Sequence, residues 1–136
     1  MPVEATLFLK SRVIVVEDNE PVRKSLSLLL RTRGYIVDAF EAGEHLLTGQ
    51  HIPDADCFLI DFRLPDLNGV QLLNALRDAG RTAPAILITA CVTAEIRAKA
   101  AAAGFRSVIE KTPHRLSLVD EIANAIADHG KSDMRA

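Results

Sequence analysis

The sequence lacks any excess of positive charge. Its 16 lysines and arginines face 18 aspartates and glutamates, which gives a formal net charge of −2 at pH 7, and no basic run stands out. Proteins that bind nucleic acid directly need clustered basic side chains to neutralise phosphates. We therefore expect no direct nucleic-acid binding by this domain, so any contact with DNA would be made by another domain.

Long hydrophobic runs and cysteines are also scarce. The apolar stretches fall far short of the roughly 20 residues that cross a bilayer. The N-terminal Leu7-Phe8-Leu9 is too short for the core of a signal peptide. The two cysteines, Cys57 and Cys91, are expected to be reduced, packed thiols. Together these features predict a cytoplasmic protein that is not associated with a membrane.

The chain is too short for a second domain. Its 136 residues, 49% hydrophobic and 25% charged, have the composition of an ordinary globular domain with one core. We expect an N-terminal lead over residues 1–11, one domain over residues 12–129, and a polar tail or the start of a linker over residues 130–136. Such a chain would be either a stand-alone domain or one excised from a longer protein.

Short apolar runs alternate with helical patterns along the domain. Buried parallel strands are expected at residues 12–16, 35–39, 57–60, 85–88 and 106–110. Helices are expected at about residues 20–33, 42–48, 69–78, 93–103 and 114–129. Five successive βα units with right-handed crossovers predict an α/β fold with a doubly wound parallel sheet.

Polar residues follow four of the five expected strands. They are Glu17-Asp18, Asp61, Thr89 and Lys111. Because parallel strands end at one edge of the sheet, where open α/β folds place their sites, we expect these side chains to converge. Three clustered carboxylates repel one another unless a cation lies among them. Mg²⁺ is the natural choice, since it prefers oxygen ligands and shares them with phosphate.

Asp61 is the expected phosphoryl acceptor, because an aspartate carboxylate can attack phosphorus and form an aspartyl phosphate. Such catalysis depends on positioning and on charge neutralisation by a metal ion and a lysine, for which Lys111 is the candidate. Singly, each residue has an ordinary explanation: Glu17-Asp18 as a solvated loop, Thr89 as a turn cap and Lys111 as a solvated ammonium. The inference depends on their joint occurrence at equivalent strand ends.

Four segments around these residues carry a family resemblance. They are residues 15–19, 59–69, 88–90 and 109–111, in the family's order within residues 12–129. They resemble the receiver domain of bacterial response regulators, the CheY-like family of two-component signalling. The match is closest to receivers of the FixJ type, which usually precede a DNA-binding helix-turn-helix domain. The resemblance implies a flavodoxin-like sheet of five parallel strands in the order 2-1-3-4-5, with five helices.

The resemblance also implies how the acids act. Asp61 would accept a phosphoryl group from a phosphohistidine of a sensor histidine kinase. Asp18 and Asp61 would bind Mg²⁺ directly, and Glu17 would act largely through water. The main-chain carbonyl of Arg63 would complete the protein ligands.

By the same resemblance, Lys111 would pair with the phosphoryl oxygens and Thr89 would move its hydroxyl toward them. The added charge would then bias a two-state surface, usually the fourth helix, fifth strand and fifth helix of the family. The protein would be a signalling switch with an output domain or partner protein, and not an enzyme beyond weak self-catalysed phosphorylation and dephosphorylation. Dimerisation through the last helices is left open.

The chain departs from the family in two places. Receivers commonly carry an aromatic residue three positions before the lysine, but here this residue is Val108, which has no ring to rotate. The lysine is usually followed by proline, often through a cis bond, whereas this chain reads Lys111-Thr112-Pro113. We predict a trans bond before Thr112, because a cis bond there would cost about 3–4 kcal/mol.

Two variable positions flank the expected site. Arg63, two residues after Asp61, could shield the phosphoryl group or compete with Lys111 for its oxygens, and we hypothesise that it alters phosphoryl lifetime. The alternative is that Arg63 points to solvent. Cys91, two residues after Thr89, would be redox-sensitive only if it were exposed.

Two other functions stay open at this point. One is a phosphoesterase with an aspartyl nucleophile, which would normally carry a second acid where this chain has Arg63. The other is a receiver-like interaction scaffold with impaired phospho-switching, an alternative raised by Val108 and Thr112. Retention of all five polar strand-end residues argues against the scaffold.

Overall fold

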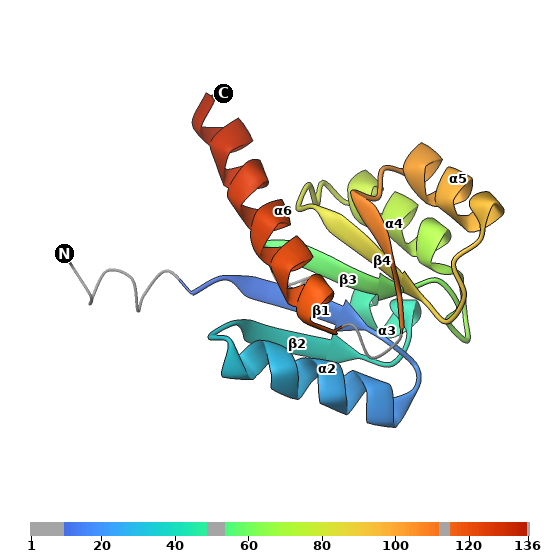
Figure 1. Ribbon diagram of the computed structural model, residues 1–136. Helices are drawn as coiled ribbons and strands as arrows, with labels where there is room; N and C mark the ends of the chain where they lie inside the picture. The colour runs from blue at the N-terminus through green and yellow to red at the C-terminus, as the bar shows by residue number, and fades with distance from the viewer. Residues whose placement is uncertain (1–9, 49–53, 112–114, 136) are drawn as a thin grey trace.

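The computed structural model describes residues 10–48, 54–111 and 115–135, and in the last of these segments it describes the side chains of residues 117–129. It contains a five-stranded parallel sheet in the order β2-β1-β3-β4-β5, which confirms the predicted doubly wound fold (Figure 1). The strands are β1 (Arg12–Val16), β2 (Ile36–Phe40), β3 (Cys57–Asp61), β4 (Ala85–Thr89) and β5 (Ser107–Glu110). The helices are α2 (Glu20–Thr32), α3 (Gly43–Leu47), α4 (Gly69–Asp78), α5 (Ala94–Ala103) and α6 (Arg115–Arg135).

Helices cover both faces of the sheet. On one face α2 and α6 pack over Val13 and Val15 of β1, and on the other α3, α4 and α5 cover Ile14 and Val16. Because alternate residues of a strand point to opposite faces, β1 contributes to both halves of the core and is buried from Val13 to Val16. Two apolar layers therefore hold the central strands in place.

Local signals set the ends of several helices. Asn19, Asn68 and Thr93 each accept a hydrogen bond from the backbone N–H three residues later, so each caps the helix that follows it. Pro21 lies in the first turn of α2, where its missing N–H costs nothing. Gly104 ends α5 with φ of 101°, a left-handed conformation that suits glycine.

Several element boundaries differ from the predicted ones by a residue or more, and two of these differences have a clear physical reason. The second strand begins at Ile36 instead of Tyr35, because the Tyr35 amide donates to the Leu30 carbonyl (3.2 Å) and closes the end of α2. The last helix continues to Arg135, beyond its predicted end at residue 129, so residues 130–135 are helical. A single glycine costs only about 1 kcal/mol inside a helix, and Gly130 therefore does not stop it.

The prediction that both cysteines are packed was half wrong. Cys57 is buried in β3, but Cys91 is exposed in the loop beyond β4. A residue just past the end of a buried strand need not share the strand's burial. Within the described segments, no helix has both the length and the apolar character needed to span a membrane.

Candidate phosphoryl-acceptor site

The register of the sheet brings the polar strand ends together. Val16 of β1 lies beside Ile60 of β3, so Glu17 and Asp61 follow at the same level. Asp61 pairs with Ile88 of β4, and Thr89 pairs with Glu110 of β5, the residue before Lys111. The side chains predicted from four separate runs therefore share the carboxyl edge of the sheet, where doubly wound folds place their sites.

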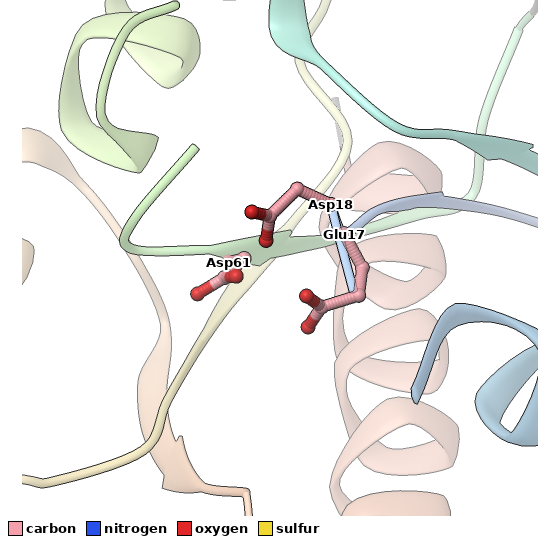
Figure 2. Close-up of side chains that lie close together, drawn as sticks. All are labelled: Glu17, Asp18 and Asp61. Carbon is pink, nitrogen blue, oxygen red and sulfur yellow. The ribbon is translucent and has the colours of Figure 1, made fainter. Parts of the chain in front are cut away.

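Three carboxylates form a compact cluster at this edge. Glu17, Asp18 and Asp61 each offer an oxygen, and these oxygens lie within 4.8 Å of one another (Figure 2). Glu17 and Asp61 are buried, with 0% and 3% of their surface exposed, whereas Asp18 is exposed. The cluster is therefore built from the ends of two adjacent strands and opens to solvent at Asp18.

Lys111 supplies a positive charge to the two buried acids. Its Nζ lies 2.6 Å from Glu17 Oε1 and 2.8 Å from Asp61 Oδ2. Burial acts to lower the pKa of Lys111, but the bonds to Asp61 and Glu17 outweigh it and raise that pKa. The ammonium therefore stays charged and neutralises part of the acidic cluster.

Glu17 is the most perturbed group of the site. Burial raises its pKa from 4.5 to about 7, although Lys111 and the backbone N–H of Asn19 act in the opposite direction. Oε2 accepts that N–H at 3.0 Å, and Oε1 pairs with the Lys111 ammonium at 2.6 Å. A carboxylate oxygen has two lone pairs, so each of these atoms can accept one more ligand besides its present partner.

The donor set suits a hard divalent cation. It consists of carboxylate oxygens, the donors that Mg²⁺ prefers, and a buried oxygen has spare acceptor capacity. The backbone N–H of Arg63 donates to Asp61 Oδ1 at 3.2 Å, which fixes the loop close to the acceptor, and its side chain is exposed. The predicted use of the Arg63 carbonyl as a ligand stays a prediction.

Thr89 is buried at the end of β4, but its hydroxyl is directed to the loop. It donates to the carbonyl of Cys91 at 3.3 Å. Val108 is half-buried and packs against the core cluster on the α3, α4 and α5 face. The conformation predicted for the Lys111–Thr112 bond involves residue 112, which lies outside the described residues.

Two contacts of the site were not predicted from the sequence. Arg23 of α2 donates to the carbonyl of Glu17 (2.9 Å) and more weakly to that of Asp18 (3.3 Å). Asp66 accepts the N–H of Glu44 at 2.5 Å and so caps α3 from a different loop. The only sequence signal for these contacts was Arg23 itself, a basic residue close to the start of a helix, where the helix dipole disfavours positive charge.

Comparisons with known proteins agree with this geometry. Residues 13–123 match the model of the response regulator receiver domain. The C4-dicarboxylate transport transcriptional regulatory protein DctR of Rhodobacter capsulatus is 33% identical over 119 residues, 86% of this chain and 60% of the relative. The transcriptional regulatory protein FixJ of Rhizobium meliloti is 34% identical over 119 residues, 86% of this chain and 57% of the relative. The chain thus spans somewhat more than half the length of these two relatives.

Solved structures show the same fold. The crystal structure of FixJ-N superposes with a TM-score of 0.75 at 33% identity, covering 88% of this chain and 95% of that one. The response regulator TrrA from Thermotoga maritima, solved in complex with Mg²⁺-BeF, gives a TM-score of 0.74 at 23% identity, covering 85% of this chain and 98% of that one. Because the family match over residues 13–123 includes all four strand ends that form the site, this chain belongs to the response regulator receiver domain family.

Proposed function

We propose that this receiver domain is switched by phosphorylation of Asp61. The observation that carries the proposal is the buried Asp61 carboxylate, which lies 2.8 Å from the Lys111 ammonium and clusters with Glu17 and Asp18. A nucleophilic carboxylate, a fixed cation and two further acids are what phosphoryl transfer to aspartate requires. The chain acts as a signalling switch of a two-component system, as its family and its relatives among transcriptional regulators indicate.

The chemistry uses one oxygen of Asp61. This oxygen forms a bond to phosphorus while the bond from phosphorus to the imidazole nitrogen of a kinase histidine breaks, and the imidazole keeps the electron pair. Lys111 would neutralise the charge on the transferred oxygens and hold them in line. Asp18 and Asp61 would hold Mg²⁺, with Glu17 behind them and the Arg63 carbonyl alongside. Mg²⁺, when bound, would supply the remaining positive charge.

The phosphorylated site would be read by Thr89 and Lys111. The hydroxyl of Thr89 would leave the Cys91 carbonyl for a phosphoryl oxygen, and Lys111 would exchange its carboxylate partners for the same group. This rearrangement would couple the site to the loop between β4 and α5. With Val108 in place of an aromatic residue, the signal would pass through the loop without a rotating ring.

Receiver domains pair with sensor histidine kinases and with output domains. For this chain a cognate kinase would donate the phosphoryl group, and an output domain or a partner protein would receive the signal. A DNA-binding output is consistent with relatives that are transcriptional regulators and longer than this chain. Homodimerisation and a cytoplasmic location remain predictions.

One experiment tests the phosphoacceptor claim. The protein is incubated with Mg²⁺ and acetyl phosphate, or with a phosphorylated sensor kinase, and intact mass is measured. We expect one base-labile phosphoryl adduct on the wild type and on Asp78→Asn, an exposed carboxylate of α4 that serves as the control. The adduct should be absent from Asp61→Asn. Absence from the wild type would reject phosphorylation, and persistence in Asp61→Asn would reject the assignment of the acceptor.

The same experiment decides between the remaining functions. A receiver-like scaffold would form no adduct under either donor. A phosphoesterase would release phosphate from an external ester and keep no stable adduct. It would also need a second acidic residue two positions after the nucleophile, where this chain has the exposed Arg63. The family match supports the receiver over both.

A further inference from the structure

Arg23 makes an unusual pair of contacts beside the acidic cluster. Its half-buried side chain reaches back from α2, and Nη1 lies 2.9 Å from the carbonyl oxygen of Glu17 and 3.3 Å from that of Asp18. We propose that Arg23 is a positioning residue for metal binding, which holds the main chain of these two acids so that their carboxylates face Asp61. This inference rests on the proposed function of the site.

The backbone of residues 17–19, which Arg23 contacts, makes few other hydrogen bonds. The Glu17 amide still donates to Phe40 of β2 (2.9 Å), but the chain then leaves the sheet and turns into α2. At the far end of the turn, the Arg23 amide donates to the Asn19 carbonyl at 2.8 Å. Arg23 therefore holds the turn from both its backbone and its side chain. Rigid support of this kind keeps ligands in the geometry that a small cation demands.

The type of contact matters as much as its position. The guanidinium donates to two neutral main-chain carbonyls, so Arg23 forms no ion pair with the carboxylates of Glu17 and Asp18. Lys111, in contrast, pairs directly with the carboxylates of Glu17 and Asp61. A positive charge near a helix N-terminus is electrostatically unfavourable, and one near a cation site repels the cation. The location of Arg23 is explained by the carbonyls that it holds.

These two effects predict opposite results when the charge is removed. If Arg23 affects the site only through its positive charge, its removal should tighten Mg²⁺ binding, because the electrostatic repulsion of the cation is lost. If Arg23 positions the acids, its removal should weaken Mg²⁺ binding despite that loss. Residues that orient metal ligands typically contribute about 10–100-fold to affinity, and the opposing field reduces this, so we expect Arg23→Ala to weaken Mg²⁺ binding by about tenfold.

The test compares Mg²⁺ affinity among three variants and the wild type by calorimetric titration with MgCl₂. Arg23→Lys keeps the charge, but its ammonium lies on a shorter side chain than the Nη1 atom that contacts both carbonyls, so its affinity should fall between those of the wild type and Arg23→Ala. Arg31→Ala is the matched control, because Arg31 also lies in α2 and donates to a carbonyl, that of Val37 at 3.1 Å. Its affinity should equal that of the wild type.

Amide hydrogen exchange without Mg²⁺ adds a readout that does not involve the metal. The amides of residues 17–19 should exchange faster in Arg23→Ala than in Arg31→Ala, while those of β3 stay equally protected in both. If the wild type binds Mg²⁺ and Arg23→Ala binds it equally well or more tightly, the inference is overturned and the proposed function stays intact. A wild type that takes up no Mg²⁺ overturns both. If Arg23→Ala does not fold, Arg23→Lys decides, and wild-type affinity there overturns the inference.

Discussion

Gly69 begins α4 directly against the acceptor residue, and a side chain there would disturb both. A Cβ at this position would lie 2.6 Å from the carbonyl oxygen of Asp61 and 2.9 Å from Cδ1 of Leu87. The Gly69 amide also donates to the Phe62 carbonyl at 2.9 Å, which closes the loop that follows the acceptor. Replacing Gly69 with alanine therefore tests whether helix and acceptor strand approach as closely as the structure indicates.

The size of the effect follows from the contact. Ordinary contacts begin at 3.4 Å, so the Asp61 carbonyl or α4 must move by about 0.8 Å. Such overpacking costs about 1–3 kcal/mol. Alanine recovers at most about 1 kcal/mol through its higher helix propensity. We expect a net loss of about 1–2 kcal/mol in the free energy of unfolding, or about 4–8 °C in melting temperature.

Urea denaturation of Gly69→Ala measures this loss, and the rate of phosphorylation by acetyl phosphate reports the displacement of Asp61. Gly43→Ala in α3 is the matched control, because its Cβ would meet only the side-chain ends of Leu67 and Leu72 at 3.2 Å, which can rotate away. It should lose less stability and keep the wild-type rate. If Gly69→Ala were as stable as the wild type, or gained the stability expected from helix propensity, the close approach would be refuted.

The remaining predictions concern the protonation of Glu17, the reactivity of the two cysteines and the role of Arg63. Without Mg²⁺, the free energy of unfolding should fall as pH rises from 4.5 to about 7, because Glu17 binds its proton more tightly in the folded protein than in the unfolded chain. Glu17→Gln should flatten this pH dependence. An unchanged pH dependence in that variant would contradict the raised pKa of Glu17. Burial raises the pKa of Cys57 to about 12, so a thiol reagent should label only the exposed Cys91 in the native protein and both cysteines after unfolding, as counted by mass; native labelling of Cys57 would contradict its burial. Arg63→Ala should speed dephosphorylation if the side chain shields the phosphoryl group, and an unchanged rate of loss of the adduct would reject that role.

The sequence was sufficient for the sheet and for the residues at its edge. Buried strands are marked by continuous apolar runs, and polar residues such as Asp61 and Thr89 stand out directly after them. Parallel topology then implies that the strand ends meet, which the Lys111 contact to Asp61, across 50 residues of sequence, bears out. Periodicity and topology together were therefore enough to bring the polar strand ends to one edge.

Other features depend on tertiary placement and left little trace in the sequence. The bond from the Tyr35 amide to Leu30 decides where β2 begins, and Asp66 caps α3 across a chain separation of 22 residues. The contacts of Arg23 depend on how its long side chain folds back over the turn. Neither hydrophobic period nor local propensity encodes such contacts, since they are set by side-chain direction after the elements have packed.

The position of Lys111 also bears on when the domain becomes competent during folding. The acceptor and the other two acids lie within the first 61 residues, but the ammonium that contacts two of them follows β5, which joins the sheet at its edge beside β4. Long-range pairings of this kind form only after much of the chain has been ordered. A nascent or partly folded chain can therefore hold Asp61 without the charge that stabilises a transferred phosphoryl group. The complete site therefore requires β5 to be in place, so phosphorylation would report on molecules whose sheet is complete.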